Sequence, residues 1–114
     1  MVVLAAGKVV LVPFPFSDLS QSKVRPAICL ASAGRGDWIL CQVTSNPYGD
    51  PDAIPLSPNE FFSGGLLTLS CARPGKLFTA HESLVSRSVA TLTSTALDAL
   101  LVAVTSIIRP AQIP

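Results

Sequence analysis

The sequence has few of the groups from which most enzyme active sites are built. Only 13% of its 114 residues are charged, and His81 is the single histidine. The seven acidic residues are scattered along the chain, without the spacing of a metal-binding cluster, and a glycine-rich phosphate loop is missing. Metal-dependent hydrolysis, a histidine-based triad and nucleotide binding by a phosphate loop are therefore unsupported, and neither a metal nor another cofactor is expected.

Cysteines are also few, and they do not form a pattern. Cys29, Cys41 and Cys71 are an odd number, lie in apolar segments and lack Cys-x-x-Cys spacing, which argues against a disulfide framework and a zinc site. Buried thiols in a reducing cytoplasm are expected.

The apolar N-terminal segment lacks a basic leader and is interrupted by Lys8, which fits a signal peptide poorly. The longest helical candidate, residues 95–108, is too short to span a bilayer, so we expect a cytoplasmic protein without membrane contact.

The overall charge gives no general attraction to nucleic acid. Eight Lys or Arg residues oppose seven Asp or Glu residues, for a formal net charge of +1. Any binding to RNA or DNA must therefore depend on where individual cations are placed.

The length predicts one domain over residues 1–114, and 49% hydrophobic residues suffice for its core. Ten prolines and seven glycines divide the chain into short pieces, which favours a small β-rich fold.

The order of apolar runs and turn residues predicts strands followed by one helix. The aliphatic run Lys8–Pro13 is typical of a strand buried on both faces. A polar loop over residues 16–25 and a turn-rich loop over residues 46–52 interrupt the strands. Hydroxyl side chains at residues 91–94 can cap an amphipathic helix, which Arg109 and Pro110 end. Further strands are predicted over residues 26–31, 38–44, 53–56, 66–72 and 76–79, with turns at 32–37 and 73–75.

Arg25 is the residue that points most directly to a site. Pro26 disfavours a helical backbone at Arg25, so its side chain projects from the start of a strand. A guanidinium grips phosphate oxygens in a bidentate manner and keeps its charge at any working pH. Thr44 and Ser45, at the end of a later strand, add hydroxyl groups. The same residues also fit a structural interpretation, with Arg25 as a surface charge and the Thr-Ser pair as turn chemistry.

Several segments together resemble a known family. They are GKVVLVPFPFSDLSQSKVRPAICL, the later QVTS, the stretch LSCARPGKLFT and the C-terminal amphipathic helix. In this order they resemble the MazF/PemK family of toxin endoribonucleases from type II toxin-antitoxin modules, over residues 6–108.

The resemblance implies an SH3-like β-barrel of the CcdB/MazF type with a C-terminal helix. It also implies a homodimer that binds single-stranded RNA and a cognate antitoxin, and that cuts RNA without a metal through the substrate's own 2′-hydroxyl. Carried over by position, the catalytic arginine falls on Arg25 and the partnering hydroxyl on Thr44. The remaining RNA-binding candidates lie beside these residues or in the loop that would gate the site: Phe16, Ser17, Lys23, Ser45 and Lys76.

Two other functions are compatible with the same fold. A non-catalytic relative of the CcdB type would poison gyrase by protein binding, and an SH3-like interaction module would have neither activity. The phosphate-binding potential of Arg25 and Thr44 argues against both, since neither function needs it.

Overall fold

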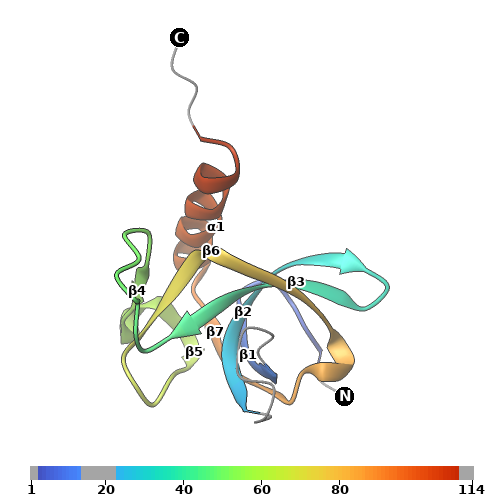
Figure 1. Ribbon diagram of the computed structural model, residues 1–114. Coiled ribbons are helices and arrows are strands. Elements are labelled where there is room, and N and C mark those ends of the chain that lie inside the picture. Colours follow the sequence, from blue (N-terminus) through green and yellow to red (C-terminus); the bar gives the residue numbers. More distant parts are fainter. Residues whose placement is uncertain (1–2, 14–22, 111–114) are drawn as a thin grey trace.

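The computed structural model describes residues 3–13 and 23–110, which form one seven-stranded antiparallel sheet and a C-terminal helix (Figure 1). The strand order is β4-β6-β3-β2-β1-β7-β5. The sheet curls into a nearly closed barrel, so that its edge strands β4 and β5 lie on the same side (Figure 1). The elements are β1 (Lys8–Pro13), β2 (Val24–Gly34), β3 (Asp37–Thr44), β4 (Ile54–Leu56), β5 (Phe61–Gly64), β6 (Ser70–His81), β7 (Arg87–Leu92) and α1 (Ser94–Ile108).

Strand β1 lies between β2 and β7 in the sheet and is buried on both faces, as predicted. Val9 belongs to the larger apolar cluster, beneath α1, while Val10 and Val12 belong to a second cluster on the opposite face. All three side chains are fully buried. In β2 the same alternation places Ile28 in the first cluster and Cys29 in the second. A continuous aliphatic run is therefore the sequence pattern of a strand covered on both sides.

The helix α1 begins and ends close to the predicted residues. Thr93 caps its N-terminus, accepting a hydrogen bond from the backbone N–H of Ala96 at 3.1 Å. Leu100 and Val104 are buried against the barrel. Ile108 is 71% exposed because the last helical turn extends past the barrel (Figure 1).

The β2–β3 hairpin is tighter than the predicted turn over residues 32–37. Both strands run further, and only Arg35 and Gly36 form the turn, with positive φ angles of 56° and 81°. Two consecutive positive φ angles define a type I′ turn, whose twist matches the flanking strands. Strand β2 also begins earlier than predicted, at Val24, because Val24 and Arg25 pair with Pro13 and Val12 of β1.

The predicted turn at Arg73–Pro74–Gly75 is wrong. Strand β6 runs without a reversal from Ser70 to His81, and these residues lie at a bulge within it. Arg73 pairs with Gln42, but the next pair along β3 joins Cys41 to Leu77, so three residues of β6 stand outside the ladder. A bulge tolerates the missing N–H of Pro74, which is fully buried. Strands β5 and β7 were not predicted, because their sequences are short or rich in polar residues.

Candidate functional site

A cleft of about 740 Å³ opens at one end of the barrel. Its floor and walls come from strands β1, β2, β3, β6 and β7, together with the loops that follow β3 and β5. Arg25 and Thr44 both line it. The two residues singled out from the sequence for phosphate binding therefore face one cavity, although they lie on different strands.

The cleft is lined with cations. Four of the eight Lys and Arg residues of the chain line it: Arg25, Arg73, Lys76 and Arg87. Among the described residues, no acidic side chain lines the cleft. Asp50 is paired with Arg73, but the remaining cations still make the cavity locally positive in a nearly neutral protein. This is the local placement of charge that binding to a polyanion requires.

Strand register explains why Arg25 and Thr44 come together. The β2–β3 ladder ends at the pair Ala27 and Gln42. Arg25 and Thr44 each lie two residues beyond this pair, so both are on the same side of the sheet as Ala27 and Gln42. Opposite residues of antiparallel strands point to the same face. Arg25 is exposed and forms no hydrogen bond or ion pair with the residues that the structure describes. Its guanidinium is therefore available to a bound anion.

The Thr44 hydroxyl is oriented by the backbone of the loop that follows β3. Its Oγ1 accepts a hydrogen bond from the backbone N–H of Asn46 at 3.2 Å. Its carbonyl oxygen accepts one from the Cys71 thiol at 3.5 Å, across the β3–β6 ladder. Because Oγ1 acts as the acceptor towards Asn46, the hydroxyl hydrogen is left for a ligand oxygen.

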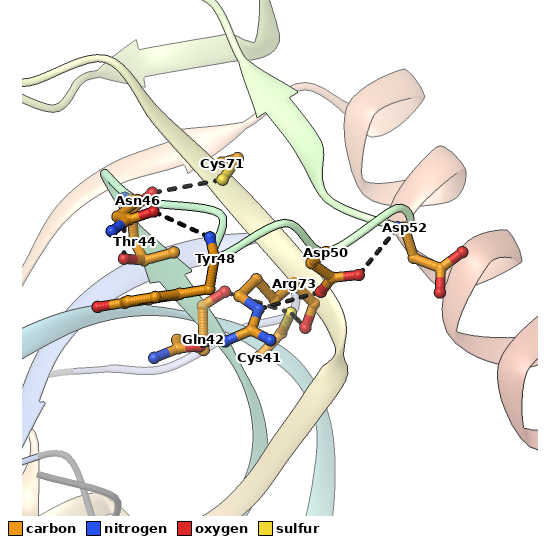
Figure 2. A network of polar contacts seen from close by, with 9 residues as sticks. All are labelled: Cys41, Gln42, Thr44, Asn46, Tyr48, Asp50, Asp52, Cys71 and Arg73. Atoms are coloured by element: carbon orange, nitrogen blue, oxygen red, sulfur yellow. Dashed lines mark hydrogen bonds and ion pairs between the residues drawn. The ribbon is translucent and has the colours of Figure 1, made fainter.

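Arg73 is the centre of a polar network on the cleft wall (Figure 2). Its Nε donates to Asp50 Oδ2 at 3.0 Å, and its Nη1 donates to Gln42 Oε1 at 3.2 Å. Its Cζ also lies 5.4 Å from the centre of the Tyr48 ring, within cation–π range. Unlike Arg25, Arg73 therefore holds the loop after β3 in place against β6.

Protonation of Asp50 is expected to weaken this network. The backbone N–H of Asp52 and the Arg73 guanidinium stabilise the carboxylate and lower the pKa of Asp50 below its usual value. A carboxyl with a lowered pKa in the folded state stabilises the fold above its unfolded-state pKa of about 3.9. This stabilisation is lost as the pH falls through the folded-state pKa.

We therefore expect Asp50→Asn to depend less on pH than the natural protein does. Below about pH 4, its free energy of unfolding should fall less steeply, as measured by urea denaturation between pH 7 and pH 2.5. Asp52→Asn is the matched control, because Asp52 is exposed and contacts Asp50 through its backbone N–H, which the substitution keeps. Parallel pH profiles for Asp50→Asn and the natural protein would show that the carboxylate contributes nothing.

The remaining predicted site residues divide into three groups. Ser45 and Lys76 line the cleft beside Thr44 and Arg73. Lys23 is exposed just before β2 and does not line it. Phe16 and Ser17 lie outside the described residues.

Sequence reasoning missed three cleft residues that the barrel brings together. Arg73 was assigned to a turn, and Arg87 belongs to the unpredicted strand β7, where it pairs with Leu11 of β1. Tyr48 was placed in a loop without a role. Arg73 stands in a stretch already noted for its resemblance to the family, LSCARPGKLFT, which is the one signal that pointed towards it.

The other titratable groups do not point to a second chemistry. All three cysteines are free and buried, as expected. Burial raises the pKa of Cys29 to about 11 and of Cys41 to about 12, so neither thiol forms a nucleophilic thiolate at neutral pH. His81 Nδ1 accepts a hydrogen bond from the backbone N–H of Ser83 at 3.1 Å and so caps the helical turn at Glu82–Leu84. Across residues 3–13 and 23–110, His, Cys, Asp and Glu side chains do not gather into a group of three that could hold a metal.

Known proteins resemble this chain in structure more than in sequence. No protein-family model matches it, and no curated protein gives a significant sequence match. In the part of the chain that the structure describes, no helix has the length and apolar character needed to cross a membrane.

Solved structures, in contrast, match over almost the whole chain. An endoribonuclease in complex with its cognate antitoxin, from a mycobacterial species, has a TM-score of 0.74 at 11% identity and covers 97% of this chain and 100% of its own. MazE-MazF from Deinococcus radiodurans has a TM-score of 0.70 at 20% identity, covering 96% and 98%. Mycobacterium tuberculosis toxin MazF-mt6 has a TM-score of 0.70 at 15% identity, covering 92% and 99%. The predicted resemblance is thus confirmed at the level of the fold, and the chain is a β-barrel of the MazF type.

Proposed function

We propose that this protein is the toxin of a type II toxin-antitoxin module and cuts single-stranded RNA without a metal. The observation that carries the proposal is the cationic cleft, in which Arg25 and Thr44 face the same cavity. The fold supports it, because solved proteins of the same fold include an endoribonuclease and MazF toxins. Arg25 and Thr44 act as the catalytic residues, and Ser45 and Lys76 contact the RNA beside them.

The substrate supplies the nucleophile in this mechanism. The 2′-oxygen of a ribose attacks the adjacent phosphorus, the bond from phosphorus to the 5′-oxygen breaks, and the proton lost by the 2′-hydroxyl is balanced by one gained at the 5′-oxygen. The products are a 2′,3′-cyclic phosphate and a 5′-hydroxyl. Arg25 stabilises the additional negative charge on the non-bridging oxygens of the pentacoordinate phosphorane, and Thr44 donates a hydrogen bond to one of these oxygens.

Partners follow from the same proposal. We infer a cognate antitoxin, by analogy with the mycobacterial endoribonuclease solved in complex with its own. We also infer a homodimer, since several large apolar side chains are exposed and would gain from burial against a second copy. These include Phe62 at 80%, Leu69 at 74%, Val102 at 58% and Ile108 at 71% exposure.

One experiment tests the proposed RNA cleavage and distinguishes it from gyrase poisoning. The purified protein is incubated with a long single-stranded RNA in the presence of EDTA, and separately with gyrase and relaxed plasmid. We expect RNA fragments at defined positions and normal supercoiling. Intact RNA with blocked supercoiling would instead identify a protein-binding toxin of the CcdB type. Neither effect would indicate an interaction module.

A further inference from the structure

Tyr48 presents an aromatic ring to the solvent at the wall of the cleft. It is the single tyrosine of the chain, lines the cleft and is 65% exposed. A ring of this size usually gains from burial, so its exposure beside four cations calls for a ligand that offers an aromatic surface and a negative charge. An unpaired nucleotide offers both, since its base stacks on aromatic side chains while its phosphate meets the cations.

The ring is held in position before any ligand arrives. Tyr48 has a φ angle of 54°, in the left-handed region that tyrosine seldom occupies. Asn46 Oδ1 accepts a hydrogen bond from the Tyr48 backbone N–H at 2.9 Å, which stabilises this conformation. A strained backbone that neighbouring groups maintain is frequent at ligand-binding sites. The loop therefore orders the ring in advance and reduces the entropy cost of binding.

Arg73 supports the ring from the cleft wall. Its guanidinium lies 5.4 Å from the ring centre and is itself fixed by the ion pair with Asp50. The Arg73 side chain is only 17% exposed, so it is anchored and does not sweep through solvent. Since most of the ring surface stays in solvent, a base has room to stack there.

Gln42 adds hydrogen-bonding groups next to the ring. It pairs directly with Arg73 in the β3–β6 ladder, and its Oε1 accepts from Arg73 Nη1. This bond leaves the amide nitrogen of Gln42 pointing away from Arg73 (Figure 2). An amide N–H₂ donates to the carbonyl oxygens and ring nitrogens on the edge of a base.

We propose that Tyr48 is the stacking platform for an unpaired nucleobase next to the phosphate bound by Arg25, and that the Gln42 amide contacts the edge of that base. The inference rests on the proposed function and adds a specificity-determining residue to it. A base within a duplex is already stacked and paired, so a platform of this kind selects single-stranded substrates.

The test measures binding apart from cleavage. The probe is a fluorescent single-stranded DNA of mixed sequence, which lacks the 2′-hydroxyl and is not cut, and its affinity is measured by fluorescence anisotropy. Tyr48→Ala is expected to weaken binding by about 5-fold to 150-fold, the range measured for one stacked base, whereas Tyr48→Phe keeps the ring and stays within about threefold. Leu84→Ala is the control for removal of an exposed apolar side chain, because Leu84 is 52% exposed but does not line the cleft.

A set of DNA probes with one abasic position each identifies the stacked base. At one position, removing the base is expected to weaken binding by the same factor as Tyr48→Ala. Combining the two changes is expected to weaken binding no further, because they remove the same contact. Unchanged affinity in Tyr48→Ala, or additive losses at every abasic position, would overturn the stacking inference. Such DNA-binding results would not contradict the proposed function if the natural protein still cuts RNA in EDTA. Failure to cut RNA would count against the proposed function, whatever the DNA affinities show.

Discussion

Arg25→Ala is expected to reduce the rate of RNA cleavage by about a thousandfold or more, with little change in thermal stability. Arg25 is exposed and makes no polar contact with another described residue, so its removal breaks nothing that holds the barrel together. Its charge is needed most when negative charge accumulates on the phosphorus. The loss should therefore appear mainly in kcat and less in KM.

The matched control for this variant removes the same charge elsewhere. Arg109→Ala replaces an exposed arginine at the end of α1, outside the cleft, and is expected to cut RNA at a rate close to that of the natural protein. Single-turnover cleavage of a short labelled RNA gives both rates, and thermal unfolding confirms that each variant is folded. Equal activity of Arg25→Ala and Arg109→Ala would remove Arg25 from the mechanism.

Thr44→Val is expected to slow cleavage by about 30-fold to 1,000-fold, which corresponds to about 2 to 4 kcal/mol of transition-state stabilisation. Valine has nearly the same shape but no hydroxyl, so the barrel strand is kept while the hydrogen bond to the substrate is lost. The same change removes the acceptor for the Asn46 backbone N–H. Since that N–H lies on an exposed loop, water replaces the lost partner.

Thr44→Ser separates the hydroxyl from the methyl group. We expect it to retain activity within about tenfold of the natural protein, because serine supplies a hydroxyl of the same donor class. Single-turnover rates for the two variants and the natural protein make the comparison. If Thr44→Val is as active as Thr44→Ser, the hydroxyl does not take part in the reaction.

The sequence predicted the parts of the fold that follow from local pattern. The aliphatic run of β1 could be recognised as a strand covered on both faces, since Val9 and Val10 needed apolar neighbours on opposite sides. The N-terminal cap and the end of α1 could also be predicted from the sequence, because Thr93 and Arg109 act through contacts within a few residues. The extended backbone at Arg25 was predictable for the same reason, since Pro26 restricts the backbone directly before it, although β2 begins one residue earlier still, at Val24.

Features set by pairing between distant strands were not predictable in this way. The sequence Arg73-Pro74-Gly75 has the composition of a turn, and only its pairing with β3 makes it a bulge within β6. The cationic character of the cleft is likewise a tertiary property, since Arg25, Arg73 and Arg87 come from three different strands. The composition gives a net charge near zero and does not show where the charges lie. In the folded barrel, half of the Lys and Arg residues line the cleft.

The most direct test of the central claim compares three strands of the same base sequence in EDTA. One is RNA, one is RNA with 2′-O-methyl groups throughout, and one is DNA, and the ends of any fragments are identified by mass spectrometry. We expect the protein to cut only the unmodified RNA and to leave 2′,3′-cyclic phosphate and 5′-hydroxyl ends. Cleavage of the methylated strand or the DNA, or RNA left intact, would contradict it.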